Sequence, residues 1–237
     1  MSRLILITND DGITAPGIIK LARAATKLGE VYVVAPDGER SGQSHSFTYK
    51  SEVLAAECDI GISGVRAFAC SGSPCDCVRI GTMSILPRTP DLVLSGINNG
   101  FNISSDIQYS ATIGAVMESA FRGIHSIAFS RGSLDNDDLV DHYLPLILEN
   151  LIDKKLSYNS AWNVNFPVCS LKECKGILRD CRISTDNFYQ DEYTHTITDG
   201  KHVFKVIQNR DWSASEGTDL YAVTHDYISI GPVTNIS

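Results

Sequence analysis

Two adjacent carboxylates follow the first apolar run of this chain. The run Leu4–Thr8 leads into Asn9, Asp10, Asp11 and Gly12. Two like charges side by side repel, and partial burial raises their pKa values further unless a cation lies beside them. A divalent metal ion is the simplest such cation. The same residues are also ordinary turn formers, so a strand-to-helix turn whose acids cap the next helix is the alternative explanation.

Two later loops add neutral oxygen donors after apolar runs. Residues 31–35 precede a loop that contains Ser41, and residues 91–94 precede a loop that contains Asn98 and Asn102. Because parallel strands share their carboxyl edge, we expect these loops to meet the Asp10 segment there. Carboxylates combined with neutral side-chain oxygens suit hard cations such as magnesium or manganese.

Two hydroxyls stand at the start of a predicted helix. Ser110 and Thr112 precede an apolar face with helical spacing over residues 113–121. The unpaired amides and the dipole at a helix N-terminus favour an anion, and the hydroxyls add hydrogen-bond donors. A purely structural N-cap role for Ser110 explains the same residue equally well.

The elements that must position these residues alternate between strands and helices. We expect strands at 4–8, 31–35, 91–94, 126–129 and 162–167, and helices at 16–28, 77–86, 113–121 and 137–153, the last of them bent at Pro145. Residues 46–69 are expected to form short strands and turns. This alternation predicts an α/β fold, a Rossmann-like three-layer sandwich with a mostly parallel sheet.

The amino-acid composition of the chain changes after residue 184. Between about 185 and 217 it is rich in threonine, tyrosine, histidine and charged residues around Asp199–Gly200, which predicts a β-hairpin turn. We therefore expect residues 1–184 to form the Rossmann-like catalytic core. Residues 185–237 are expected to form a β-hairpin arm and a C-terminal strand within the same domain.

Composition limits the classes of partner. The net charge of -8 argues against binding to nucleic-acid polymers, and no apolar run is long enough to span a membrane. Met1–Arg3 leads directly into a strand without a signal segment, so we expect a cytoplasmic protein. The seven cysteines form an odd, scattered set in a chain without a signal peptide, so we expect free thiols. The single residue between Cys75 and Cys77 does not fit a zinc knuckle.

Several familiar catalytic motifs are absent from the sequence. It contains no G-x-x-x-x-G-K-[ST] phosphate loop, no G-x-G-x-x-G dinucleotide turn, no G-x-S-x-G elbow and no H-E-x-x-H zinc helix. Kinase, dehydrogenase, serine hydrolase and zinc protease interpretations thus lose their main support.

Six ordered blocks closely resemble the SurE family of survival proteins. They are residues 9–17, 34–42, 95–102, 109–112, 217–219 and 227–230. The resemblance implies a cytoplasmic, metal-dependent phosphomonoesterase that hydrolyses nucleoside monophosphates as a 5′-nucleotidase, with 3′-nucleotidase and exopolyphosphatase activity as further expectations. It also implies a homodimer or homotetramer that uses C-terminal elements in assembly.

The resemblance also implies roles for individual residues. Asp10, Asp11, Ser41 and Asn98 become the ligands of one divalent ion, Mg²⁺ or Mn²⁺, and Asn102, Ser110 and Thr112 surround the substrate phosphate. Either Asp10 or Asp11 is expected to move a proton. This chain departs from the family pattern at Ala111, where glycine is usual, at Cys75, where threonine is usual, and in a shorter C-terminal tail.

Two other functions remain open at this point. Adjacent aspartates after a first strand also occur in zinc-dependent N-deacetylases of the LmbE type, which need histidine ligands that this chain lacks near Asp10. Alternatively, the acids only tie loops together in a nonenzymatic, metal-stabilised oligomeric module.

Overall fold

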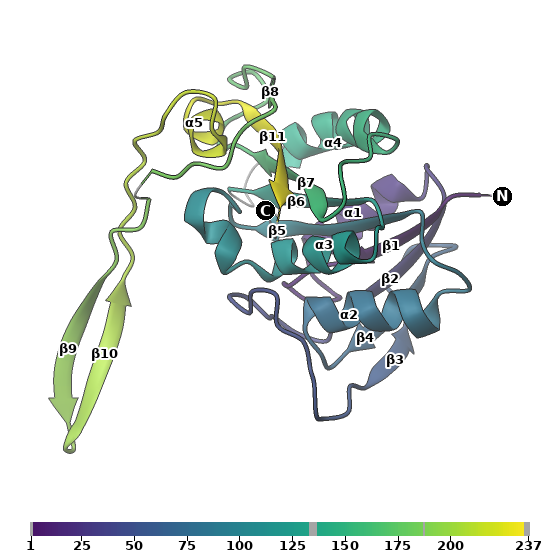
Figure 1. Ribbon diagram of the computed structural model, residues 1–237, viewed down its shortest axis with the longest axis horizontal. Helices are drawn as coiled ribbons and strands as arrows, with labels where there is room; N and C mark the ends of the chain where they lie inside the picture. Colours follow the sequence, from purple (N-terminus) through teal and green to yellow (C-terminus); the bar gives the residue numbers. More distant parts are fainter. Residues whose placement is uncertain (1, 133–136, 187, 235–237) are drawn as a thin grey trace.

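A mostly parallel sheet forms the centre of the protein (Figure 1). The computed structural model describes residues 2–132, 137–186 and 188–234, and within them nine strands are ordered β3-β4-β2-β1-β5-β6-β7-β11-β8. These strands are β1 (Leu4–Thr8), β2 (Glu30–Pro36), β3 (Ala55–Cys58), β4 (Arg66–Cys70), β5 (Leu92–Asn99), β6 (Ser126–Arg131), β7 (Ser160–Phe166), β8 (Ile177–Arg179) and β11 (Ile228–Thr234). Only the β3–β4 and β7–β11 pairs are antiparallel.

Helices cover both faces of this sheet. The helical segments are α1 (Pro16–Ala25), α2 (Pro74–Ile80), the π-helix η1 (Gly81–Ile85), the 3-10 helix η2 (Ser104–Gln108), α3 (Ala111–Phe121), α4 (Asp137–Leu151) and α5 (Asp219–Thr224). Helices α1 and α4 lie on one face, whereas α2 and α3 lie on the other (Figure 1). The predicted three-layer α/β sandwich is confirmed. Among the described residues, no helix combines the length and apolar character needed to cross a membrane.

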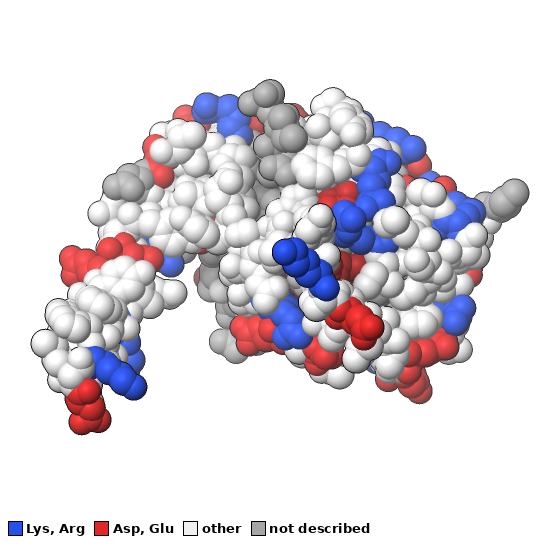
Figure 2. All heavy atoms as spheres, turned by 60° about the horizontal axis from the view of Figure 1, so that its bottom comes forward, with Lys and Arg blue, Asp and Glu red and all other residues white. Residues whose placement is uncertain are grey.

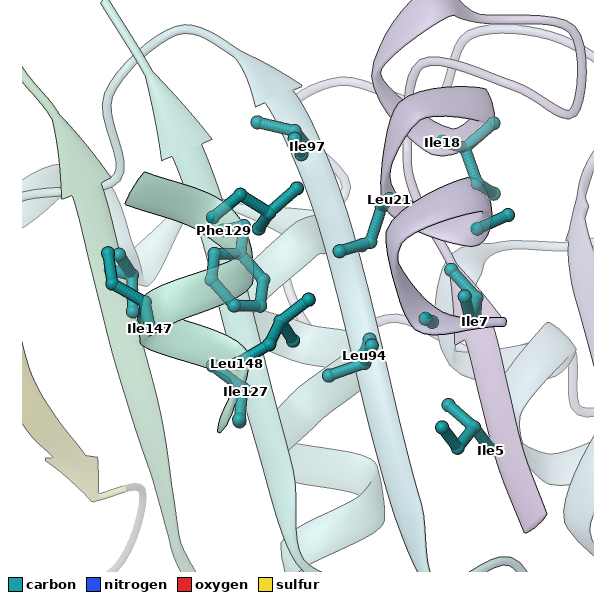
Figure 3. Close-up of a cluster of buried hydrophobic side chains, with 14 of the residues drawn as sticks. Ile5, Ile7, Ile18, Leu21, Leu94, Ile97, Ile127, Phe129, Ile147 and Leu148 are labelled. Atoms are coloured by element: carbon teal, nitrogen blue, oxygen red, sulfur yellow. The ribbon is translucent and has the colours of Figure 1, made fainter. Parts of the chain in front are cut away.

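Strand β1 shows why both faces need helices. Its side chains alternate, so Ile5 and Ile7 belong to the core cluster under α1 and α4, and Leu4 and Leu6 belong to the cluster under α2. A parallel strand buried on both faces therefore appears in the sequence as a continuous apolar run. Figure 3 shows side chains of α1 and α4 meeting those of the strands on the first of these faces.

The order of the strands creates a switch point between β1 and β5. The chain passes from β1 to β2 on one side, while β5 pairs with the other side of β1. In open α/β sheets, ligands bind outside the carboxyl ends of the strands where the winding direction reverses. The segments that follow β1 and β5 are those that carry Asp10, Asp11 and Asn98.

The predicted arm is a separate antiparallel hairpin that projects away from the body (Figures 1 and 2). Its strands are β9 (Glu192–Thr198) and β10 (Lys201–Ile207), with Asp199 and Gly200 both at positive φ in the turn. Two positive φ values are the signature of the tight turn that matches strand twist. Every residue of both strands is exposed, including Ile197 and Phe204.

One predicted helix begins and ends at the wrong residues. The sequence predicted a helix over residues 77–86, whereas α2 begins at Pro74 and passes into η1 at Gly81. Ser73 explains the earlier start, because its side chain accepts a hydrogen bond from the Asp76 amide while the Asp76 carboxylate accepts one from the Ser73 amide. This reciprocal capping box, with proline in the first turn, fixes the beginning of a helix.

Candidate functional site

The turn after β1 is built by its own side chains. The Asn9 carboxamide donates to the Gly12 carbonyl at 2.9 Å and accepts from the Gly12 amide at 3.2 Å. Gly12 has a φ of +103°, which L side chains rarely adopt. This turn takes the chain out of β geometry before the two aspartates, so their side chains are not forced to opposite faces of the sheet.

Asp10 lies in the middle of the converging loops. Its side chain is only 4% exposed, and its Oδ1 accepts a hydrogen bond of 2.6 Å from the Thr112 hydroxyl in the first turn of α3. The Asp10 carbonyl accepts from the Arg40 amide at 2.7 Å, which ties in the loop after β2. Burial raises the pKa of Asp10 to about 6, and the neighbouring Asp11 charge adds to this effect.

Asp11 ties the loop after β5 to the turn that carries Asp10. Its Oδ2 accepts a hydrogen bond of 3.2 Å from the Asn99 amide, and the residue is half-buried. Burial raises the pKa of Asp11, while the Asn99 amide and the charge of Arg131 act in the opposite direction. Arg131 ends β6, is 3% exposed and forms an ion pair with Asp137.

The two neutral metal ligands implied by the resemblance sit on these tied loops. Asn98 is half-buried, and its side-chain amide donates to the Gly100 carbonyl at 2.9 Å, which leaves the carboxamide oxygen as the donor atom for a cation. Ser41 follows Arg40 directly, but its hydroxyl donates to Glu39 Oε1 at 2.9 Å. Coordination of an ion by Ser41 would therefore require its hydroxyl to exchange this partner.

The three expected phosphate contacts have different local roles. Ser110 is the N-cap of α3 and accepts from the Ile113 amide at 3.1 Å, so the structural role expected for it is present. Thr112 donates to Asp10, which joins the start of α3 directly to the carboxylates. Asn102 is held by buried partners, and its side-chain amide donates to the Ser130 hydroxyl at 2.7 Å.

The donor set at this edge fits a hard divalent cation. Asp10 is buried beside the second carboxylate of Asp11, and burial raises the pKa of both groups, so a neighbouring cation would stabilise their ionised forms. The remaining donors, Ser41 and Asn98, are neutral oxygens. Within the described part of the chain, no three histidine, cysteine, aspartate or glutamate side chains lie close enough together to hold a metal ion. The ligand set to test is therefore the two aspartates with the neutral oxygens of Ser41 and Asn98.

Sequence reasoning missed a buried glutamate that holds the Ser41 loop. Glu118 of α3 is 6% exposed and pairs with Arg79 and Arg122 at 3.1 and 3.0 Å, and with His45 of the loop at 3.1 Å. The His45 ring also stacks on Phe121. The only signal in the sequence is one acidic residue within an apolar helix, with Arg122 one turn later.

Proton binding by Asp10 predicts how stability depends on pH. The folded-state pKa of about 6 exceeds the unfolded value of 3.8, so this group stabilises the metal-free protein below about pH 4 and the contribution is lost as the pH rises through 6. A bound dication competes with that proton. We therefore expect Mn²⁺ to raise the melting temperature more at about pH 7.5 than at about pH 5.

Thermal unfolding with and without Mn²⁺ measures this effect. Asp10→Asn is the matched control, because it removes both the proton-binding group and the charge that would bind the ion. Mn²⁺ should therefore raise the melting temperature of this variant little at either pH. An equal Mn²⁺ effect at both pH values in the wild-type protein would contradict the assignment of Asp10 to the ion.

Comparison with known proteins identifies the family. The family described as "Survival protein SurE" matches residues 5–190. A relative from Clostridium botulinum named "5'-nucleotidase SurE" is 34% identical over 233 residues, covering 97% of this chain and 92% of the relative. One of the same name from Christiangramia forsetii is 37% identical over 237 residues, covering 97% and 90%. The crystal structure of the SurE protein from Aquifex aeolicus matches with a TM-score of 0.84 and 34% identity, covering 99% of this chain and 94% of that one. This chain therefore belongs to the survival protein SurE family.

Proposed function

We propose that this protein is a hydrolase that removes phosphate from nucleoside monophosphates with the help of one divalent metal ion. The observation that carries the proposal is the buried Asp10 carboxylate, which is hydrogen-bonded to Thr112 at the start of α3 and lies next to Asp11 in sequence. A metal ion held by these acids would lie beside a helix N-terminus, which favours phosphate. The curated relatives named 5'-nucleotidase SurE support the substrate class.

Asp10, Asp11, Ser41 and Asn98 would hold Mg²⁺ or Mn²⁺ at the carboxyl edge of β1 and β5. When bound, such an ion withdraws electron density from a phosphate oxygen and lowers the pKa of a coordinated water. The chain itself would contribute the first-turn amides of α3 and the Ser110 hydroxyl, which hold the negative charge of the phosphate. The Thr112 hydroxyl would join them by exchanging its hydrogen bond to Asp10 for one to the phosphate. One of the two aspartates moves the proton that hydrolysis requires.

Three finer expectations belong to the same proposal. The phosphate site would also accept 3′-nucleotides and the terminal phosphate of polyphosphate, because its donors recognise the phosphate group. The exposed arm, with apolar side chains such as Ile197 and Phe204, would pack against another copy in a homodimer or homotetramer, since an isolated hairpin is marginally stable in water. The seven free cysteines support a reducing compartment, the cytoplasm.

A phosphate-release panel tests this function. The wild-type protein is assayed with 5′- and 3′-nucleoside monophosphates, sugar phosphates and polyphosphate, each with Mg²⁺, with Mn²⁺ and with a chelator. We expect phosphate release from 5′-nucleotides with either metal, and its loss in chelator with recovery when metal is returned. Stabilisation by metal without release from any substrate would instead favour a nonenzymatic module.

A further inference from the structure

Five aromatic rings form a continuous arc that joins the base of the arm to the body. Neighbouring rings meet in T-shaped contacts, with centroid separations of 6.3, 5.1, 5.4 and 6.0 Å along the order Phe101, Trp212, Phe188, Tyr189 and Tyr109. We call this set the aromatic arc. Phe101 lies in the loop after β5, and Tyr109 lies between η2 and α3. The other three rings lie in the two segments that flank the arm.

The two ends of the aromatic arc lie beside the expected phosphate contacts. Phe101 directly precedes Asn102, and Tyr109 directly precedes Ser110, the N-cap of α3. The arc therefore spans between the two segments that approach the phosphate in the proposed function. A phosphate ester bound at the start of α3 would extend its alcohol portion away from that point, and the two end rings leave the chain one residue before the expected phosphate contacts.

The aromatic arc is partly core and partly surface. Phe188 is 2% exposed and packs with Ile103 and Leu220, so it anchors the arc. Tyr109 is 59% exposed and Trp212 is 48% exposed, so both rings present area to solvent. Edge-to-face contacts occupy one side of a ring and leave the other available for stacking.

The segments that carry the aromatic arc are fixed to one another at the base of the arm. The segments on either side of the arm pair through Tyr189 and Arg210, and the Asp211 amide donates to the Phe188 carbonyl at 2.9 Å. The Arg210 guanidinium also lies 4.1 Å from the centre of the Tyr189 ring. A rigid aromatic surface loses little conformational freedom when a planar ligand stacks on it.

We propose that Tyr109 and Trp212 form a stacking site for the nucleobase of the substrate. This inference rests on the proposed function and adds to it a part of the substrate that the metal and phosphate contacts do not reach. Stacking uses the π face that every base has, so the site would accept purines and pyrimidines alike. It would favour nucleotides over phosphate esters that carry no base.

The test compares a nucleotide with its counterpart that lacks the base. Steady-state hydrolysis of the four common 5′-nucleoside monophosphates and of ribose 5-phosphate is measured for wild type, Tyr109→Leu and Trp212→Leu. We expect each substitution to raise KM for every nucleotide by about 5- to 100-fold, with kcat little changed and ribose 5-phosphate hydrolysis unaffected. Tyr109→Phe keeps a π face and should restore the wild-type KM.

Tyr158→Leu is the matched control. This tyrosine is also exposed, at 69%, but it lies in the α4–β7 connection at the amino-terminal ends of the parallel strands, away from the proposed site. It should leave all KM values unchanged. Equal losses on nucleotides and ribose 5-phosphate would overturn the stacking site, and so would unchanged nucleotide KM values in both Leu variants. If the wild-type protein releases phosphate from none of the substrates with Mg²⁺ or Mn²⁺, the proposed function itself fails, and this inference fails with it.

Discussion

Asp10→Asn is expected to reduce metal-dependent phosphate release by ~100-fold or more, and Asp11→Asn by a similar factor. An asparagine keeps the size of the side chain but removes the charge that would bind the dication. At Asp10 the change also weakens the acceptor of the short hydrogen bond from Thr112, so the start of α3 loses its charged partner. Phosphate release from a nucleotide at saturating Mn²⁺ measures the effect.

Stability separates this loss of activity from a loss of fold. Burial raises the pKa of Asp10, so its ionised form destabilises the metal-free protein near neutral pH. The metal-free Asp10→Asn variant should therefore melt no lower than the metal-free wild type. Asp153→Asn, at an exposed carboxylate paired with Arg3, should keep full activity as the control. Near-normal turnover in both site variants would rule out the proposed ion site.

Gly96→Ala is expected to have the largest effect on stability. Gly96 lies within β5 at a φ of +128°, and a Cβ atom there would stand 2.2 Å from the Phe129 carbonyl oxygen of β6. Both the backbone conformation and the space exclude a side chain. We expect the free energy of unfolding to fall by more than ~3 kcal/mol, measured by urea denaturation.

Gly38→Ala provides the comparison for this substitution. Gly38 follows β2, and the nearest atom to an added Cβ is the flexible Arg40 Nη1 at 3.9 Å. Its stability should stay within ~1 kcal/mol of the wild type, since nothing has to move. If Gly96→Ala proved equally mild, the close approach of β5 and β6 beneath the Asn98 loop would not be essential to the fold.

The sequence was most informative where one physical cause dominated. The alternation of apolar runs with amphipathic stretches predicted β1, α1, β2, β5, α3 and the α/β class, because burial on both faces leaves a strong periodic signal. The turn at Asp199–Gly200 was also predicted correctly, since few residues accept positive φ at both central positions. The α2 start was missed because the Ser73–Asp76 capping box was taken for a loop.

The site was less accessible to sequence reasoning because its contacts are long-range. Parallel topology predicted that the loops of Asp10, Ser41 and Asn98 would share one edge. It could not show that Thr112 donates to Asp10 or that Arg131 ends β6 near Asp11, because these contacts depend on how separate elements pack. All the assignments of side chains to the metal and to the phosphate stay predictions, and the variants above test those of Asp10 and Asp11.

The position of β11 has a consequence for synthesis on the ribosome. β8 joins the sheet only by pairing with β11, which itself inserts between β7 and β8. The arm and α5 are translated between these two partners, so β8 leaves the exit tunnel long before anything can pair with it. The nascent chain must therefore expose the unpaired β7 edge until the last strand emerges, and this interval is when chaperones would be most needed.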